Sequence, residues 1–245
     1  MMTTTTVSDL QLLKGLRRGD RQGQVRLVQE WLCLHGEHVG MDGDFGAATE
    51  VALKDFQKNN GIAATGVVDN ATFARLIGPM TAAMQPIAAG GRSLGAMVVA
   101  YAQQHLAQHP REVGGQNKGP WVRLYMNGNE GTPWAWCAGF ACFCLRQACE
   151  SVGQPLPIAT SLSCDSLASS GKSKGRFGDK SKATPGSFFL VRKSPTDWVH
   201  TGIVVSAGAD TFRTIEGNTN DDGSREGYEV CARTRGYGSL DFVQI

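Results

Sequence analysis

The sequence has little net charge and no long apolar run, and its first residues do not show the pattern expected of a secretory leader. Its 24 Lys and Arg residues against 22 Asp and Glu residues leave a formal charge of +2, without the concentrated basic surface that nucleic-acid binding requires. The longest apolar stretch, near residues 94–102, is far shorter than the about 20 residues of a membrane-spanning helix. We therefore expect a chain that neither binds nucleic acid nor inserts into a membrane.

The first residues, 1–9, combine neither a basic head nor an apolar core, so they do not predict a secretory signal peptide. We expect synthesis to begin and end in the cytoplasm. If the target lies outside the cell, another system has to deliver the protein.

The seven cysteines are an odd number and lack both the paired spacing of zinc knuckles and the pattern of a disulfide framework. Free cysteine is among the most buried residue types. Six of the seven are therefore expected to be reduced and buried in the core: Cys33, Cys142, Cys144, Cys149, Cys164 and Cys231. Cys137 differs from them in its surroundings.

A compact bundle of three short helices is predicted for the N-terminal part of the chain. Apolar residues recur at helical spacing in residues 25–32 and again in residues 51–56. A third helix is expected over residues 71–77, with Asp69 or Asn70 as its cap.

The same part carries an ordered set of markers in Gln29, the acidic turn 42–46, the pair Phe56 and Gln57, and Gly66. In these residues it resembles the peptidoglycan-binding domain found beside many cell-wall hydrolases. The resemblance covers residues 11–78, after an N-terminal tail of residues 1–10. It implies that this domain anchors the protein to peptidoglycan.

Two groups of polar residues in this domain invite a metal-binding interpretation. Asp42 and Asp44 offer too few oxygens for a calcium loop and are expected to bond the backbone of their own turn. His35 and His38 lie near Cys33, but a fourth ligand at a suitable spacing is missing.

The rest of the chain predicts a linker and an α+β domain. Residues 79–94 are small and rich in helix breakers, as in a linker, and residues 95–245 are expected to form the second domain. Its first helix should begin at residue 94 and stop before Pro110. Four later runs have strand character, at residues 187–192, 199–206, 211–216 and 228–234. Helices followed by strands favour an antiparallel sheet.

Cys137 directly precedes an apolar run that predicts a buried helix. A thiol at a helix N-terminus has a lowered pKa and lies beside N–H groups that can bind an oxyanion. Such a nucleophile needs a base, and this domain contains only His105, His109 and His200. His200, at the start of a strand, is preferred, because His105 and His109 are expected on the solvent side of the first helix.

Glu216 and Asn218 lie two residues apart at the end of the next strand, so their side chains should share one face. Either can accept the imidazole N–H and orient the base. Asn218 can also be explained by turn chemistry, which places Glu216 ahead of it.

This order of residues resembles the CHAP family of cysteine, histidine-dependent amidohydrolases and peptidases, whose domain is papain-like. The resemblance implies that Cys137 is the nucleophile and His200 the base, with Glu216 and Asn218 orienting or polarising. The runs at residues 112–117 and 136–140 are similar to a branch found in phage lysins and tail-associated lysins.

Some CHAP members bind calcium through several acids upstream of the cysteine. Here only Asn127, Asn129 and Glu130 are available in that region. We therefore expect the protein to act without a cofactor or metal.

Two further features leave alternatives open. Trp134, Trp136 and Trp198 flank the predicted nucleophile and base, where they either line a substrate groove or belong to the core. The basic stretch 171–182 is expected to be a solvated surface loop, with contact to anionic wall polymers as the alternative.

The combined interpretation is a two-domain, monomeric peptidoglycan hydrolase, favoured as a phage endolysin that a holin releases. The attacked bond is the N-acetylmuramoyl-L-alanine amide or a peptide bond of the stem or cross-link. A virion-associated lysin or a secreted antibacterial effector has the same chemistry, and a non-catalytic wall-binding or phage structural protein is the competing class. Activity is expected to fall in acid as His200 becomes protonated.

Overall fold

The computed structural model describes residues 9–21, 23–220 and 227–245 of the chain. Most of the expected N-terminal tail, residues 1–10, therefore lies outside the described residues. Within them, every helix is too short or too polar to cross a lipid bilayer.

Contacts between residues divide the chain into two compact units, each made of two separate stretches of sequence. Unit 1 comprises residues 1–82 and 111–132, and unit 2 comprises residues 83–110 and 133–245. The stretch 111–132, expected from the sequence in the C-terminal domain, is thus grouped with the N-terminal helices.

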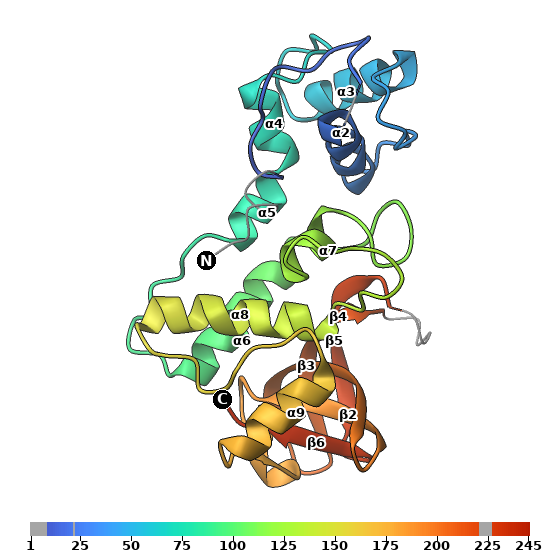
Figure 1. Cartoon of the computed structure of the whole chain (residues 1–245). Coiled ribbons are helices and arrows are strands. Elements are labelled where there is room, and N and C mark those ends of the chain that lie inside the picture. Colours follow the sequence, from blue (N-terminus) through green and yellow to red (C-terminus); the bar gives the residue numbers. More distant parts are fainter. Residues whose placement is uncertain (1–8, 22, 221–226) are drawn as a thin grey trace. The chain divides into compact units, whose positions relative to one another are not determined.

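Four helices of unit 1 pack together, because α2 contacts each of the other three. They are α2 (Gly23–Leu34), α3 (Ala47–Asn59), α4 (Asn70–Leu76) and α7 (Pro120–Tyr125) (Figure 1). The carboxylate of Asp69 accepts a hydrogen bond from the Thr72 amide (2.8 Å) and caps α4. The predicted three-helix bundle is confirmed, and α7 is added to it.

The buried face of α3 differs from the predicted one at Val51, which is 59% exposed. Leu53 and Phe56 are buried as expected. Successive helical residues are rotated by about 100°, so Val51 lies nearly opposite Leu53. Ala52, rather than Val51, joins the apolar stripe.

Two buried glutamines, Gln29 and Gln57, bond to the turns that contain further residues of the resemblance. Gln29 Nε2 donates to Asp42 Oδ1 (2.9 Å), and Gln29 Oε1 accepts from the Gly43 amide (2.9 Å). Gln57 repeats the arrangement: it donates to the Val67 carbonyl (2.9 Å) and accepts from the Gly66 amide (2.9 Å). Each buried glutamine thereby satisfies backbone groups of one turn.

The acidic turn is closed as expected, because the carboxylate of Asp42 also accepts a hydrogen bond from the Asp44 amide (2.9 Å). His35, considered above as a metal ligand, instead places Nε2 2.8 Å from the Leu76 carbonyl oxygen.

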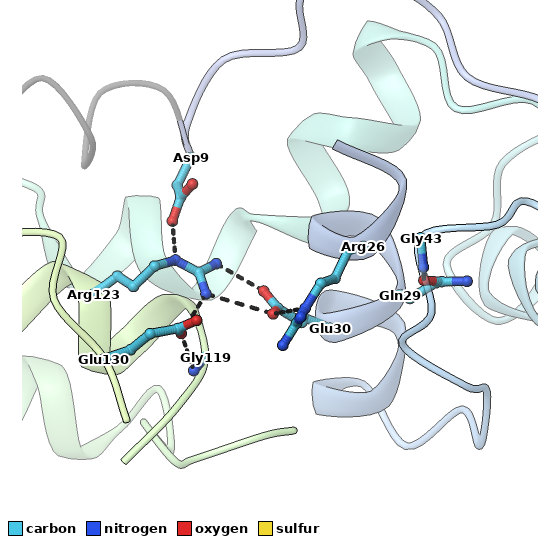
Figure 2. A network of polar contacts seen from close by, with 8 residues as sticks. All are labelled: Asp9, Arg26, Gln29, Glu30, Gly43, Gly119, Arg123 and Glu130. Atoms are coloured by element: carbon cyan, nitrogen blue, oxygen red, sulfur yellow. Dashed lines mark hydrogen bonds and ion pairs between the residues drawn. The ribbon is translucent and has the colours of Figure 1, made fainter. Parts of the chain in front are cut away.

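An ion network joins the stretch 111–132 to α2 within unit 1 (Figure 2). The guanidinium of Arg123 donates to Asp9 (2.6 Å), Glu30 (2.7 Å) and Glu130 (2.8 Å). Glu30 is only 2% exposed and also accepts from Arg26 (3.2 Å). Burial alone would lower the pKa of Arg123, but its carboxylate partners raise it, so the guanidinium stays charged.

Unit 2 contains a six-stranded sheet with three long helices. The helices are α6 (Leu94–Leu106), α8 (Cys137–Val152) and α9 (Cys164–Ser173). The strands are β1 (Phe177–Gly178), β2 (Phe188–Ser194), β3 (Asp197–Ala207), β4 (Thr211–Thr219), β5 (Glu229–Gly236) and β6 (Leu240–Val243) (Figure 1). The strand order is β1-β6-β2-β3-β4-β5, and all neighbouring strands are antiparallel. Helix α8 packs on α6, β3 and β4, while α9 packs on β3.

The predicted α+β class with an antiparallel sheet is confirmed, and three details are new. The basic stretch 171–182 is not a single loop, because it contains the end of α9, all of β1 and a 3-10 turn (Lys180–Lys182). Strand β6 lies inside the sheet between β1 and β2. Helix α5 (Gly78–Ala83) occupies the beginning of the segment interpreted as a linker.

One face of the sheet carries an aromatic cluster. Phe189, Phe212 and Phe242 are buried and pack together, and Phe212 stacks on Tyr237 with ring centroids 5.0 Å apart. The ring of Phe189 also contacts His200 (5.9 Å between centroids). The sheet core therefore reaches the predicted base.

Candidate active site

Cys137 is the first residue of α8, as predicted, and its side chain is only 4% exposed. The preceding amide, that of Trp136, donates to Asn218 Oδ1 (3.1 Å). The first hydrogen bond within the helix runs from the Phe140 amide to the Trp136 carbonyl (2.9 Å). The amides between these positions have no acceptor inside the helix, and the positive end of the helix dipole lies there. A thiolate and an oxyanion are both favoured at this end of α8.

His200 lies on β3, directly beside a register shift in its pairing with β2. Its imidazole lies near enough to Cys137 for the two groups to shift each other's pKa. The other side of the ring is also held, because Nε2 lies 2.8 Å from Glu216 Oε2. With Nε2 bound to the carboxylate, the opposite nitrogen, Nδ1, is left for the sulfur.

Glu216, on β4, is completely buried and accepts hydrogen bonds on both oxygens. Arg235 of β5 donates from Nε to Oε1 and from Nη2 to Oε2, each at 2.6 Å. The hydroxyl of Thr214 donates to Oε1 (2.5 Å). Together with His200, these donors keep the carboxylate ionised, since a buried anion needs partners of this kind.

These contacts shift the proton equilibria of the cluster. Hydrogen bonds with Cys164 and His200 hold the pKa of the Cys137 thiol well below its usual range, although burial alone would raise it. The backbone of Thr201 acts in the same direction as these two hydrogen bonds. Burial would lower the pKa of His200, but its interactions with Cys137 and Glu216 raise that pKa to about 9. Both shifts favour a resting pair of a thiolate on Cys137 and an imidazolium on His200.

The pKa of Glu216 moves in the opposite direction to that of His200. Burial alone would raise the pKa of this carboxyl, but hydrogen bonds from Arg235 and His200, together with their charges, lower it to about 2. Glu216 is a fixed anion throughout the physiological range.

Asn218 contacts the start of the helix that carries Cys137. Its Oδ1 binds the Trp136 amide, and its Nδ2 donates to the Gly227 carbonyl (2.7 Å). Between the two predicted orienters, Gly217 brings β4 against α8: an added Cβ there would lie 2.7 Å from Cβ of Phe140. The structure thus brings Glu216 to the imidazole and Asn218 to the start of α8.

The three tryptophans occupy different environments. Trp136 is fully buried and Trp198 is 6% exposed, and the Trp198 indole N–H donates to Asp241 (2.8 Å). The ammonium of Lys172 lies 4.4 Å from the Trp198 ring centroid. Both side chains belong to the core, whereas Trp134 is half-buried.

Sequence reasoning missed two polar groups of this cluster. Arg235 carried no signal of its own, because it lies in a strand with alternating exposed residues. Cys164 was grouped with the buried structural cysteines, yet its Sγ lies 4.0 Å from Sγ of Cys137. Only the packing of α9 on β3 brings it there.

Two interior cysteines contrast with Cys137. Burial raises the pKa of Cys142 to about 11 and also raises that of Cys144. Both are poor thiolates, as expected for positions inside the helix.

One prediction about a residue near the base is wrong. His105 is fully buried rather than on the solvent side of α6, because its ring contacts those of Phe140 and Phe143, and burial lowers its pKa to about 4. Beside the base, Gly202 makes room for Glu216, whose Cγ would lie 2.8 Å from a Cβ added at Gly202.

Within the described residues, no three His, Cys, Asp or Glu side chains gather closely enough to hold a metal ion. Glu130, one of the three residues considered for calcium, lies in unit 1. Its carboxylate there accepts hydrogen bonds from the Gly119 amide (3.0 Å) and Arg123.

Residues 21–76 match the model of a family described as a putative peptidoglycan binding domain. The matched residues include Gln29, Gln57 and the turns that they hold. Peptidoglycan is therefore supported as a partner of this part of unit 1. Among curated proteins, a search gives no match to the chain.

Three solved structures show local similarity. One is a peptidoglycan-binding protein from Clostridioides difficile in complex with glutamine hydroxamate (38% identity, 26% of this chain and 40% of that chain, TM-score 0.26). The SleB N-terminal domain has 30% identity over 26% of this chain and 90% of that chain (TM-score 0.26). The endolysin of Burkholderia phage AP3 has 26% identity over 38% of this chain and 36% of that chain (TM-score 0.26). The chain thus spans less than half of the first and third, and TM-scores this low carry no conclusion about the fold.

Proposed function

We propose that the protein is a peptidoglycan hydrolase that cleaves an amide bond through a covalent thioester on Cys137. The observation that carries the proposal is the continuous contact from Cys137 through His200 to Glu216, at the start of a buried helix. The family match of residues 21–76 supports the choice of polymer.

In the proposed reaction, the Cys137 thiolate attacks the carbonyl carbon of the amide, and the carbonyl oxygen becomes an oxyanion beside the first amides of α8. The His200 imidazolium gives its proton to the leaving nitrogen as the C–N bond breaks. His200, now neutral, takes a proton from water as the water oxygen attacks the thioester carbon. The C–S bond then breaks and the carboxylic acid leaves, so that Cys137 is released as the thiolate beside the His200 imidazolium, which restores the resting pair.

Glu216 and Asn218 have different parts in this scheme. Glu216 orients the imidazole and stabilises its positive charge in the manner of a triad acid. Asn218 fixes the backbone at the start of α8, so that the nucleophile and the oxyanion donors stay aligned. Nucleophile, acid and base are all side chains of the chain, so we propose that catalysis needs no metal. Activity should persist in a chelator.

The bond attacked is proposed to be the N-acetylmuramoyl-L-alanine amide or a peptide bond in the stem or cross-link. Mass analysis of the fragments released from purified sacculi separates the two. New N-terminal L-alanine on free stem peptides indicates an amidase, whereas cleaved stems or cross-links indicate an endopeptidase. A phage endolysin is the favoured source of such a protein, and a virion lysin or an injected effector has the same chemistry.

The loss of turbidity of purified sacculi tests the enzymatic proposal. Wild-type protein should clear the suspension, and Cys137→Ala should not, while both should sediment equally with the sacculi. Cys144→Ala is the matched control, because it removes a buried thiol from the same helix and should keep activity. Equal release by wild type and Cys137→Ala would leave the competing class, a non-catalytic wall-binding or phage structural protein.

A further inference from the structure

A second thiol lies against the proposed nucleophile. Cys164 is the first residue of α9, is 8% exposed, and places Sγ 4.0 Å from Sγ of Cys137. Both sulfurs therefore lie at helix N-termini, at a separation that allows an S–H to S hydrogen bond. The remaining polar contacts of the Cys137 sulfur come from His200 and Thr201.

The position of Cys164 is fixed from both sides. Ser163 caps α9 by accepting a hydrogen bond from the Ser166 amide (3.4 Å). The next residue, Asp165, accepts from the Trp198 amide of β3 (2.8 Å). The start of α9 is thus tied to the strand that also carries His200, two positions further on.

We propose that Cys164 is a positioning residue whose S–H group donates a hydrogen bond to the Cys137 thiolate, holding the sulfur at the start of α8 and stabilising its charge. This inference rests on the proposed function, in which Cys137 is the nucleophile. It adds to that site a hydrogen-bond donor that no sequence pattern indicated.

The surroundings decide which of the two sulfurs carries the charge. The His200 imidazolium and the backbone of Thr201 face Cys137. The hydrogen bond with Cys137 raises the pKa of Cys164, and burial, the charge on Cys137 and the neighbouring Asp165 carboxylate act in the same direction. Two adjacent buried thiols do not both ionise. The proton therefore stays on Cys164, and the negative charge stays on Cys137.

The rate of alkylation of Cys137 by iodoacetamide, followed by mass spectrometry at a series of pH values, reports its thiolate fraction without any peptidoglycan. In freshly reduced wild-type protein, this rate should stay high into the acid range. In Cys164→Ala and Cys164→Val, which lack the donor, the acid limb of this profile should move up by about one pH unit, so that the rate falls about tenfold at pH values below both pKa values. Valine keeps most of the side-chain volume, so one non-donor variant is available if the other does not fold.

Cys164→Ser retains a hydroxyl donor and should restore most of the wild-type pH profile. Cys144→Ala removes an equally buried thiol and should leave the profile unchanged. A profile that is the same in wild type and the non-donor variants would overturn the proposal, and so would a serine variant that behaves like alanine, since Cys164 would then only fill space.

The result of the alkylation experiment does not depend on whether the protein hydrolyses peptidoglycan. If Cys137 alkylates in acid but the wild-type protein releases nothing from sacculi, the proposed function fails while the hydrogen bond stands. If the sacculi dissolve but the pH profile of alkylation is the same in wild type and the Cys164 variants, the proposed function stands while the hydrogen-bond proposal fails. In active protein, the non-donor variants should also lose rate at pH 6 more than at pH 8.

Discussion

Charges alternate along the cluster of unit 2: thiolate at Cys137, imidazolium at His200, carboxylate at Glu216 and guanidinium at Arg235. Each inner charge has an opposite charge on both sides, so a largely buried row of ions carries no net charge. A buried ion whose partner is removed costs several kcal/mol. Each charge therefore stabilises the charged form of its neighbour. Arg235 keeps Glu216 ionised, and the Glu216 carboxylate in turn keeps the proton on His200.

Replacement of Glu216 by glutamine tests this chain of charges. Glu216→Gln removes the anion that raises the pKa of His200, so the imidazolium becomes less populated and less well oriented. The rate of sacculus clearing should fall on the order of 10³-fold or more, as in triads that lose their acid. Glu150→Gln, at an exposed position of α8, is the matched control. A clearing rate within twofold of wild type in Glu216→Gln would contradict this role.

The pH dependence of clearing follows from the direction of each shift. The reactive pair exists above the lowered pKa of Cys137 and below the pKa of His200, about 9. Clearing should therefore be flat across neutral pH, fall as pH rises through about 9, and fall in acid as the thiolate is protonated. The sequence alone predicted an acid fall caused by protonation of His200. If the rate of clearing did not fall on the alkaline side, that result would contradict the ion pair of Cys137 and His200.

Stability should follow the same proton equilibria, measured as the urea midpoint at each pH. Glu216 has a lowered folded pKa, about 2, so its contribution is present above its unfolded pKa and is lost as pH falls towards 2. The folded pKa of His200 is raised, so its contribution is full below about 6.5 and is lost as pH rises through about 9.

At the residue scale, the sequence brought Cys137, His200 and Glu216 together because their order along the chain resembles a known pattern. It could not reveal Arg235 or Cys164. Arg235 reaches Glu216 only through the register of β5 on β4. Cys164 reaches the nucleophile only through the packing of α9. Both depend on tertiary contacts that leave no local signal.

Among the elements, those with strong periodicity or turn residues were predicted, and short or weakly patterned ones were missed. Strand β1 has two residues and β6 has four, too few for an alternating pattern to show. Helix α9 contains glycine, several serines and only a narrow buried stripe of Cys164, Leu167, Ala168 and Gly171. Serine and glycine are weak helix formers, so this helix depends on its Ser163 cap and on packing.

The contact between α2 and α7 depends on a buried arginine. Arg123 is 12% exposed and holds Glu30, which is 2% exposed. Arg123→Ala would leave Glu30 with Arg26 as its ion partner (3.2 Å), and breaking a buried pair in this way typically costs about 3–5 kcal/mol. Urea denaturation should show a loss of that size.

Arg18→Ala is the matched control for this loss. The Arg18 side chain is 65% exposed and pairs with Glu50 (3.4 Å), and exposed pairs contribute at most about 1 kcal/mol. If the two variants lose the same stability, the network around Arg123 is not the stabilising contact that its burial indicates.

For the whole molecule, the sequence and the structure divide the chain differently. Composition and turn residues predicted a single domain boundary in residues 79–94, because a segment rich in small residues can be recognised from its own sequence. The structure groups residues 111–132 with the N-terminal helices instead. One cause is Trp121, which is 1% exposed and packs edge to face with Trp31 (6.1 Å between centroids). A tryptophan pair between distant segments cannot be read from either segment alone.

Hydrogen exchange in the full chain distinguishes the two divisions. Elements that unfold together share protection, so amides of α7 should exchange with those of α2, and not with those of α8. Arg123→Ala should therefore speed exchange in α2 and α7 together, because both lose their common ion network. Amides of α8 and of β3 should keep their wild-type protection, since they belong to unit 2. If α7 instead keeps the protection of α8 while α2 opens, residues 111–132 belong with unit 2, as the sequence indicated.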